Sequence, residues 1–137
     1  MMTIPQLLKY TLPKFKKGSQ YVSLKKVRTG TNKAGFDKIM ATAYSTRNID
    51  GKPKSGPPQQ HIVGLTALTD KSFKGAVKVS CSCEAFTYTC EVALHKHGAS
   101  DIFYSNGDAP DTTNPKMIPT LCKHLYVLCS EVSSGGF

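Results

Sequence analysis

Two short motifs of metal-ligating residues place the strongest constraint on how this chain can fold. Cys81 and Cys83 are separated by one residue at the end of a β-forming run. Cys122 and His124 are likewise separated by one residue, just after Thr120. Alternate residues of a strand project from the same face, so the first pair can converge on one ion if the strand bends there.

The second pair needs a different local structure. Residues two apart in a helix point to nearly opposite sides, so Cys122 and His124 can share an ion only where a helix begins. Thr120 is a favoured N-cap residue and predicts that beginning at the motif. Cys81, Cys83, Cys122 and His124 are therefore the predicted metal ligands, and three thiolates with one imidazole are a donor set of tetrahedral structural zinc.

The other cysteines and histidines supply alternative ligands. The chain has five cysteines, all in its C-terminal half. The alternative ligands are Cys90, Cys129, His95 and His97, although both cysteines fall on apolar helix faces where core packing is favoured. If Cys90 or Cys129 joined the three motif cysteines, four thiolates could hold an iron–sulfur cluster, which is the alternative to Zn²⁺.

The pattern of apolar residues predicts an α+β fold. β-forming runs separated by turn signals predict strands at residues 21–29, 36–46, 61–68 and 76–83. Apolar residues at helical spacing predict a helix over residues 84–97 that stops at Gly98, and a second helix that starts at Thr120. The expected architecture is a small antiparallel sheet of about four strands followed by two helices around a metal site.

Length and composition set the domain organisation. A chain of 137 residues is long enough for one hydrophobic core. Residues 1–17, which contain two prolines, are expected to form an N-terminal arm, and residues 18–137 a single α+β domain. Within that domain, residues 18–75 form a basic β part and residues 76–132 the metal-binding β-α part. A loop is expected over residues 48–60, which hold three prolines and two glycines.

The start of the chain and its apolar runs bear on location. The first residues lack the basic and apolar regions of a secretory signal peptide, and the cysteine count is odd. We therefore expect that the protein is not secreted by way of a signal peptide and that it has no disulfide framework. No apolar run approaches the length of a membrane-spanning helix, so we expect no membrane association.

Positive charge is concentrated in the first part of the chain. Lysine plus arginine number 18 against 9 acidic residues, giving a net charge of +9. Residues 1–60 hold 12 basic and 2 acidic side chains, whereas residues 61–137 hold 6 and 7. Such a field favours nucleic acid, an anionic surface or an acidic protein partner. The candidate phosphate contacts are Lys14, Lys16, Lys17, Lys25, Lys26 and Arg28.

The sequence does not favour catalysis. It contains no nucleophile motif, P-loop, GxGxxG or HExxH signature. A catalytic zinc keeps an open coordination position, whereas four available protein ligands would close the site. We therefore expect a protein that is not an enzyme and has no small-molecule substrate.

Two resemblances extend this interpretation. CxC on a strand followed by CxH at a helix start resembles the SWIM-type zinc finger, which implies zinc at the four predicted ligands and binding of nucleic acid or protein. The chain is also similar to small proteins of tailed bacteriophages in its VSCSC, YSNG and PxLCKHL segments, at Val79–Cys83, Tyr104–Gly107 and Pro119–Leu125. That likeness implies a virion component, such as a tail or baseplate part, found in the virion or the host cytoplasm.

Two functional hypotheses follow. The first is a non-enzymatic, metal-stapled structural or interaction module whose partners are other proteins of a larger assembly, in this case a virion. The alternative is a nucleic-acid-binding SWIM-like zinc finger protein that uses the basic N-terminal part. Only two of the 18 basic residues are arginine, the preferred reader of bases, which favours the first hypothesis.

Overall fold

A five-stranded sheet runs through the whole protein. The structure is a computed structural model that describes residues 1–45, 59–101, 107 and 113–135. The strand order is β1-β5-β4-β3-β2, and every neighbouring pair is antiparallel. The strands are β1 (Met2–Thr3), β2 (Val22–Thr31), β3 (Asp37–Ser45), β4 (Gln59–Ala67) and β5 (Ala76–Cys81).

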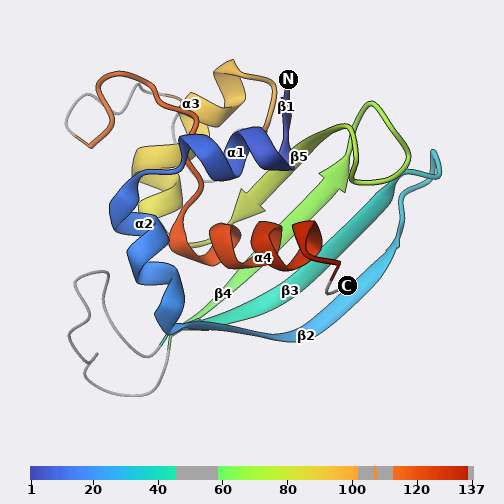
Figure 1. Ribbon diagram of the computed structural model, residues 1–137, viewed down its shortest axis with the longest axis horizontal. Helices are drawn as coiled ribbons and strands as arrows, with labels where there is room; N and C mark the ends of the chain where they lie inside the picture. Colours follow the sequence, from blue (N-terminus) through green and yellow to red (C-terminus); the bar gives the residue numbers. More distant parts are fainter. Residues whose placement is uncertain (46–58, 102–106, 108–112, 136–137) are drawn as a thin grey trace.

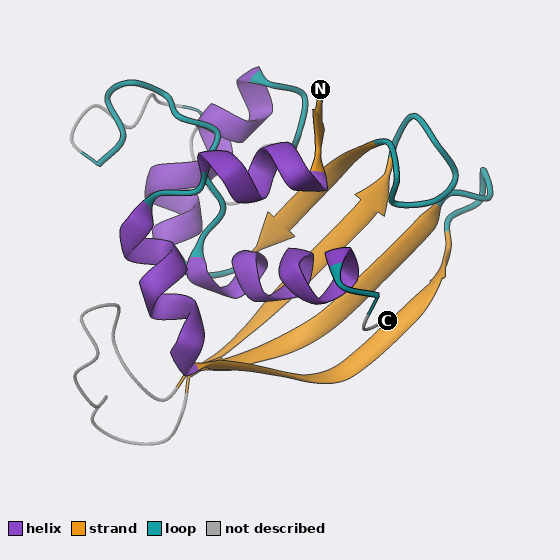
Figure 2. Ribbon diagram, viewed as in Figure 1, coloured by secondary structure: helices purple, strands orange, loops and turns teal. Residues whose placement is uncertain are grey.

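The helices lie together on one face of this sheet (Figure 1, Figure 2). They are α1 (Ile4–Tyr10), α2 (Pro13–Gly18), the 3-10 turn η1 (Ser19–Tyr21), the π-helical segment η2 (Phe86–Cys90), α3 (Glu91–Lys96) and α4 (Lys123–Ser133). The result is a two-layer α+β architecture, as the sequence predicts. None of the helices in the described ranges is long and apolar enough to cross a membrane.

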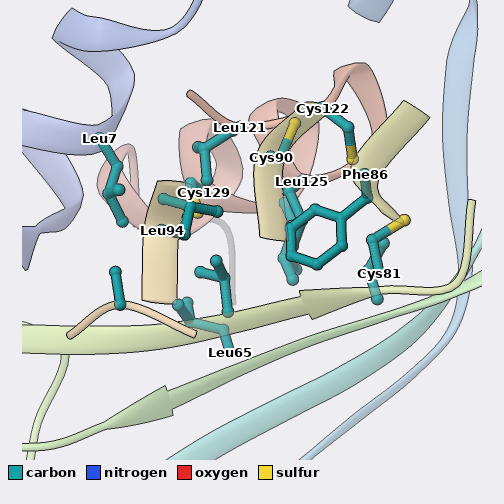
Figure 3. Close-up of a cluster of buried hydrophobic side chains, with 14 of the residues drawn as sticks. Leu7, Leu65, Cys81, Phe86, Cys90, Leu94, Leu121, Cys122, Leu125 and Cys129 are labelled. Atoms are coloured by element: carbon teal, nitrogen blue, oxygen red, sulfur yellow. The ribbon is translucent and has the colours of Figure 1, made fainter. Parts of the chain in front are cut away.

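Alternation along the strands explains why helices cover only one face. In β3, Ile39, Ala41 and Ala43 are buried, whereas Met40 between them is exposed. Side chains two apart in a strand share a face, so β3 contributes a buried row to the helix layer and leaves its other row outside. Figure 3 shows the resulting core, in which Leu65 of β4 lies beneath Leu94 and Leu125 of the helices.

The expectation of a separate N-terminal arm is wrong. Met2 and Thr3 pair with Val77 and Ala76 and add a fifth strand that the sequence analysis did not predict. The Thr3 hydroxyl accepts a hydrogen bond from the Gln6 N–H, and the Gln6 side chain accepts one from the Thr3 N–H, so a capping box starts α1.

The two prolines of this segment start helices instead of interrupting one. Each lies in the first turn of a helix, where its missing N–H costs no hydrogen bond. Each helix then turns an apolar side chain toward the core, and both Leu7 of α1 and Phe15 of α2 are buried. Residues 1–17 therefore belong to the same hydrophobic core as the rest of the domain.

Integration of this segment gives a testable stability difference. The Leu7→Ala variant is expected to lose about 2–5 kcal/mol of unfolding free energy, because a fully buried leucine leaves a cavity when truncated. Tyr10→Ala, on the same helix but 48% exposed, should cost less than about 1 kcal/mol. Urea unfolding followed by circular dichroism measures both. Equal and small losses would indicate a segment that is not packed on the core.

The helix predicted at residues 84–97 is present but is not regular. Its central turn, η2, is π-helical, and α3 follows directly. Gly98, at φ +72°, ends the helix as predicted, with its N–H donating to the His95 carbonyl and the Ala99 N–H donating to the Leu94 carbonyl. Most of the loop expected at residues 48–60 lies outside the described residues, as do residues 104–106 of the YSNG segment.

Candidate metal centre

The structure brings all four predicted ligands together at one end of the core. Cys81 is the last residue of β5, Cys83 precedes the middle helix, Cys122 precedes α4 and His124 is in its first turn. One candidate ligand atom from each lies within 4.8 Å of every other, and all four side chains are buried. Three elements that are distant in sequence therefore meet at this cluster.

The end of β5 directs the first two thiols toward the helices. Cys81 continues the buried row of Val77 and Val79, so its side chain projects from the helix-covered face. The strand ends there, two residues earlier than predicted. The Ser82 N–H donates to the Ile62 carbonyl oxygen at 3.1 Å, and its hydroxyl accepts from the Ile62 N–H at 2.9 Å, which fixes the bend.

Cys83 occupies the position that begins the next helix. Its carbonyl accepts a hydrogen bond from the Thr87 N–H at 3.2 Å, and its Sγ accepts one from the Phe86 N–H at 3.3 Å. The sulfur therefore satisfies an N–H that the first turn of a helix leaves without an internal partner. This capping contact turns the Cys83 thiol toward the end of β5.

The start of α4 positions the second pair, although not through the residue that the sequence suggests. Thr120 is not the N-cap, because its hydroxyl accepts from the Leu12 N–H at 2.9 Å and donates to the Leu121 carbonyl at 3.0 Å. Cys122 is the N-cap and α4 begins at Lys123. The predicted geometry still holds, since Cys122 and His124 lie where the chain enters the helix and the positive end of its dipole favours a thiolate.

The distances fit a tetrahedral ion. The Nδ1 atom of His124 is 3.9 Å from the Cys81 Sγ and 4.0 Å from the Cys122 Sγ. Bond lengths of about 2.3 Å to sulfur and about 2.0–2.1 Å to nitrogen imply S···N separations of about 3.6 Å around a tetrahedral zinc. These two S···N separations need a contraction of only a few tenths of an ångström, and all four donor atoms lie within 4.8 Å of one another, so the cluster could hold a metal ion.

The three thiols differ in acidity. Burial raises the pKa of the Cys81 thiol and that of the Cys122 thiol well above the usual cysteine value. Hydrogen bonds from the Cys122 and Cys81 side chains, with a smaller contribution from His124, instead lower the pKa of Cys83 far below it. In the metal-free protein these contacts favour the thiolate at Cys83 and the protonated thiol at Cys81 and Cys122.

This difference predicts how many protons the metal displaces. A bound metal requires three thiolates. Because the pKa values of Cys81 and Cys122 are raised and that of Cys83 is lowered, we expect each Zn²⁺ to displace about two protons, from Cys81 and Cys122. Zinc affinity should accordingly rise with pH and fall as acid protonates the thiols. Titration calorimetry in buffers of different ionisation enthalpy measures the number. Release of three protons would show that Cys83 is an ordinary thiol in the metal-free protein.

His61 is a neighbour of the centre that the sequence analysis did not single out. Its ring, in β4, lies 4.8 Å from the ring of His124, centroid to centroid, with a tilt of 54°. Within the described part of the chain, the buried Nε2 of His124 has no hydrogen-bond partner, whereas its Nδ1 faces the sulfurs. The packing of α4 against β4 brings these histidines together, so no local motif in the sequence could indicate the contact.

The alternative ligands do not join the cluster. Cys90 and Cys129 are fully buried in the apolar core, and burial raises the pKa of Cys129 to about 12. Figure 3 shows Cys129 beside Leu94, away from Cys81. His95 is exposed and its Nδ1 lies 2.9 Å from the Ser100 carbonyl oxygen, and His97 is exposed at the end of α3. A set of four thiolates is therefore not assembled among the described residues.

Comparison of the chain with protein-family models, with curated proteins and with solved structures gives no match. The functional assignment therefore depends on the geometry of the site itself. That geometry is a buried group of three cysteines and one histidine that could hold a metal ion at the junction of β5, the middle helix and α4.

Proposed function

We propose that this protein is a non-enzymatic structural module, stapled by Zn²⁺, that mediates protein–protein interactions in a larger assembly. The observation that carries the proposal is the convergence of Cys81, Cys83, Cys122 and His124 from three separate elements into one buried cluster. Three sulfurs and one imidazole are a donor set that structural zinc sites use, and four protein ligands leave no position for a substrate.

The chemistry of the donors favours zinc over an iron–sulfur cluster. Cluster proteins generally supply four cysteine thiolates, and the two further cysteines of this chain lie in the core outside the ligand group. A bound zinc would join the end of the sheet to the starts of two helices, and its binding free energy would add to the stability of the fold.

The metal content of the purified protein tests this proposal. We expect one zinc per chain by elemental analysis and a colourless protein. A brown protein with about four irons per chain would identify a cluster instead. Protein with neither metal, prepared under reducing conditions without chelators, would contradict the proposal.

The resemblance to small tailed-phage proteins supports a more specific form of the proposal. The matching segments include both ligand motifs, Val79–Cys83 and Pro119–Leu125. We propose that the assembly is a virion and that the protein is a tail or baseplate component, present in the particle and in the host cytoplasm. Mass spectrometry of purified particles tests it, since absence of the chain from the particle would contradict a virion role.

Binding of nucleic acid, as in the resemblance to SWIM-type fingers, is the second candidate. One contact favours it, because the Lys25 Nζ lies 5.1 Å from the centre of the Tyr44 ring and joins a cation to a side chain able to stack on a base. The six candidate phosphate contacts are nevertheless divided. Those on α2 lie in the helix layer, whereas Lys25 and Arg28 pair opposite Thr42 and Met40 on the uncovered face.

Salt dependence distinguishes the two candidates. Binding through phosphate contacts weakens steeply as salt rises from about 50 to about 200 mM, because each contact releases counterions. We expect no such steep response in fluorescence-anisotropy titrations with labelled single-stranded DNA and RNA. A loss of affinity of about 10³-fold over that range would favour the nucleic-acid function.

A further inference from the structure

The face of the sheet opposite the helices has an exposed apolar centre. Met40 of β3 and Ile62 of β4 are 48% and 54% exposed, and both project from the side that no described helix covers (Figure 2). Large apolar side chains grouped in this way on a protein surface mark interaction sites more often than chance exposure does.

Two hollows flank Met40 on this face. One, of about 200 Å³, extends across Gly64 and Ser80 toward Asp101, and the other, of about 180 Å³, lies between Met40, Ile62 and Arg28. The first exists because Gly64 has no side chain where it pairs with Met40 and Ser80. Both are smaller than the roughly 300–1,000 Å³ of small-molecule pockets, and their size suits single side chains of a partner.

Cations border this apolar centre on its β2 side and at one end. Lys25, Arg28 and Lys38 are exposed on the same side, since they pair with Thr42, Met40 and Gly30 across β2 and β3. Among the described residues the ion pair between Lys78 and Asp101, at 2.9 Å, is the only salt bridge, so these three cations have no carboxylate partner there. The surface is therefore apolar at its centre and positive along its β2 side and at one end.

We propose that this outer sheet face, formed by Lys25, Arg28, Lys38, Met40 and Ile62, is the docking surface for an acidic segment of a partner protein that also carries apolar side chains. Its apolar side chains would enter the hollows beside Met40, and its carboxylates would pair with the bordering cations. Interfaces commonly combine an apolar centre with a charged rim that steers association. The inference rests on the proposed interaction function and names the class of partner.

The same surface fits a nucleic acid less well. Single-stranded nucleic acids bind to faces that present several aromatic rings for base stacking. Among the described residues on the outer side of β2, β3 and β4, Tyr44 is the only aromatic one. The centre of this face, at Met40 and Ile62, is aliphatic. The aliphatic centre complements the apolar side chains of a segment in which acidic and apolar residues alternate. The bordering cations, which have no carboxylate partner among the described residues, complement its acidic side chains.

A model peptide of alternating glutamate and leucine provides the probe. At about 150 mM salt, we expect it to bind and to shift the backbone amide signals of Met40 and Ile62 rather than those of α4. A peptide of alternating glutamate and serine has the same charge but no apolar side chains, and should bind about tenfold more weakly. Oligothymidylate of equal charge tests the nucleic-acid alternative.

Two triple variants with identical changes in net charge locate the surface. Lys25→Glu/Arg28→Glu/Lys38→Glu should weaken binding of the glutamate–leucine peptide at least tenfold. The matched control, Lys14→Glu/Lys16→Glu/Lys17→Glu, alters α2 in the helix layer. It should change the affinity for the glutamate–leucine peptide less than about twofold. Both variants should retain zinc and their melting temperatures, because every substituted residue is exposed.

Three outcomes would overturn the inference: no peptide binding, equal loss in both variants, or tighter binding of oligothymidylate than of the peptide. Zinc content is measured on the same samples. A protein that holds one zinc but fails to bind the peptide at this face refutes the docking surface alone. A protein without zinc refutes the proposed function.

Discussion

The Cys122→Ser variant is expected to lose the proposed zinc and to be strongly destabilised. Cys122 is fully buried and ends the extended segment that enters α4, 4.0 Å from the Nδ1 atom of His124. Serine keeps the size of the side chain but removes a thiolate ligand. We expect a loss of at least about 4 kcal/mol, the range reached when a structural metal is lost.

Cys129→Ala is the matched control for this prediction. Cys129 is also a fully buried cysteine of α4, but its surroundings are apolar and it lies outside the ligand group. Its replacement should cost only about 1–3 kcal/mol for the cavity and should leave one zinc per chain. Elemental analysis and thermal melts of both proteins provide the comparison. Equal zinc contents in the two variants would show that Cys122 is not a ligand.

Removal of zinc from the unaltered protein is the second large effect. A chelator, with a reductant present to keep the five thiols free, should lower the melting temperature by more than about 10 °C. Because the proposed zinc site is assembled only in the folded protein, added Zn²⁺ should restore the stability and continue to raise it with the logarithm of free zinc. An excess of about 1,000 times the dissociation constant adds about 4 kcal/mol.

Magnesium provides the control for this experiment. Mg²⁺ prefers oxygen ligands, and the cluster offers three sulfurs and one nitrogen, so Mg²⁺ should not restore the melting temperature. A zinc-free protein that melts at the same temperature as the zinc-loaded protein would contradict a stapling role. In that case the hydrophobic core alone would hold the end of β5 against α4.

The grouping of the four candidate ligands could be predicted from sequence because each motif is local. A strand end and a helix start each fix the directions of two side chains separated by one residue. Both side chains of each motif can therefore point toward the same ion. The strand pattern could be predicted in the same way, since β3 alternates buried residues with exposed or half-buried ones and β5 alternates buried with half-buried residues from Val77 onward. These features need no knowledge of how distant segments pack.

The errors arose where distant segments decide the structure. Thr120 has the chemistry of an N-cap, but its hydroxyl accepts a hydrogen bond from the N–H of Leu12, more than one hundred residues away. The N-terminal segment appeared to be an arm because its pairing partner, β5, and its packing partner, α4, follow much later in the chain. The contact between His61 and His124 likewise depends on tertiary structure alone.

X-ray absorption spectroscopy at the zinc edge, on protein purified without added metal, tests the central claim most directly. The proposed site predicts a first shell of three sulfurs at about 2.3 Å and one nitrogen at about 2.0–2.1 Å. It also predicts the multiple-scattering signal of a single imidazole, which His124→Ala should remove. A shell of oxygen atoms, or one without sulfur, would show that these four side chains do not share an ion.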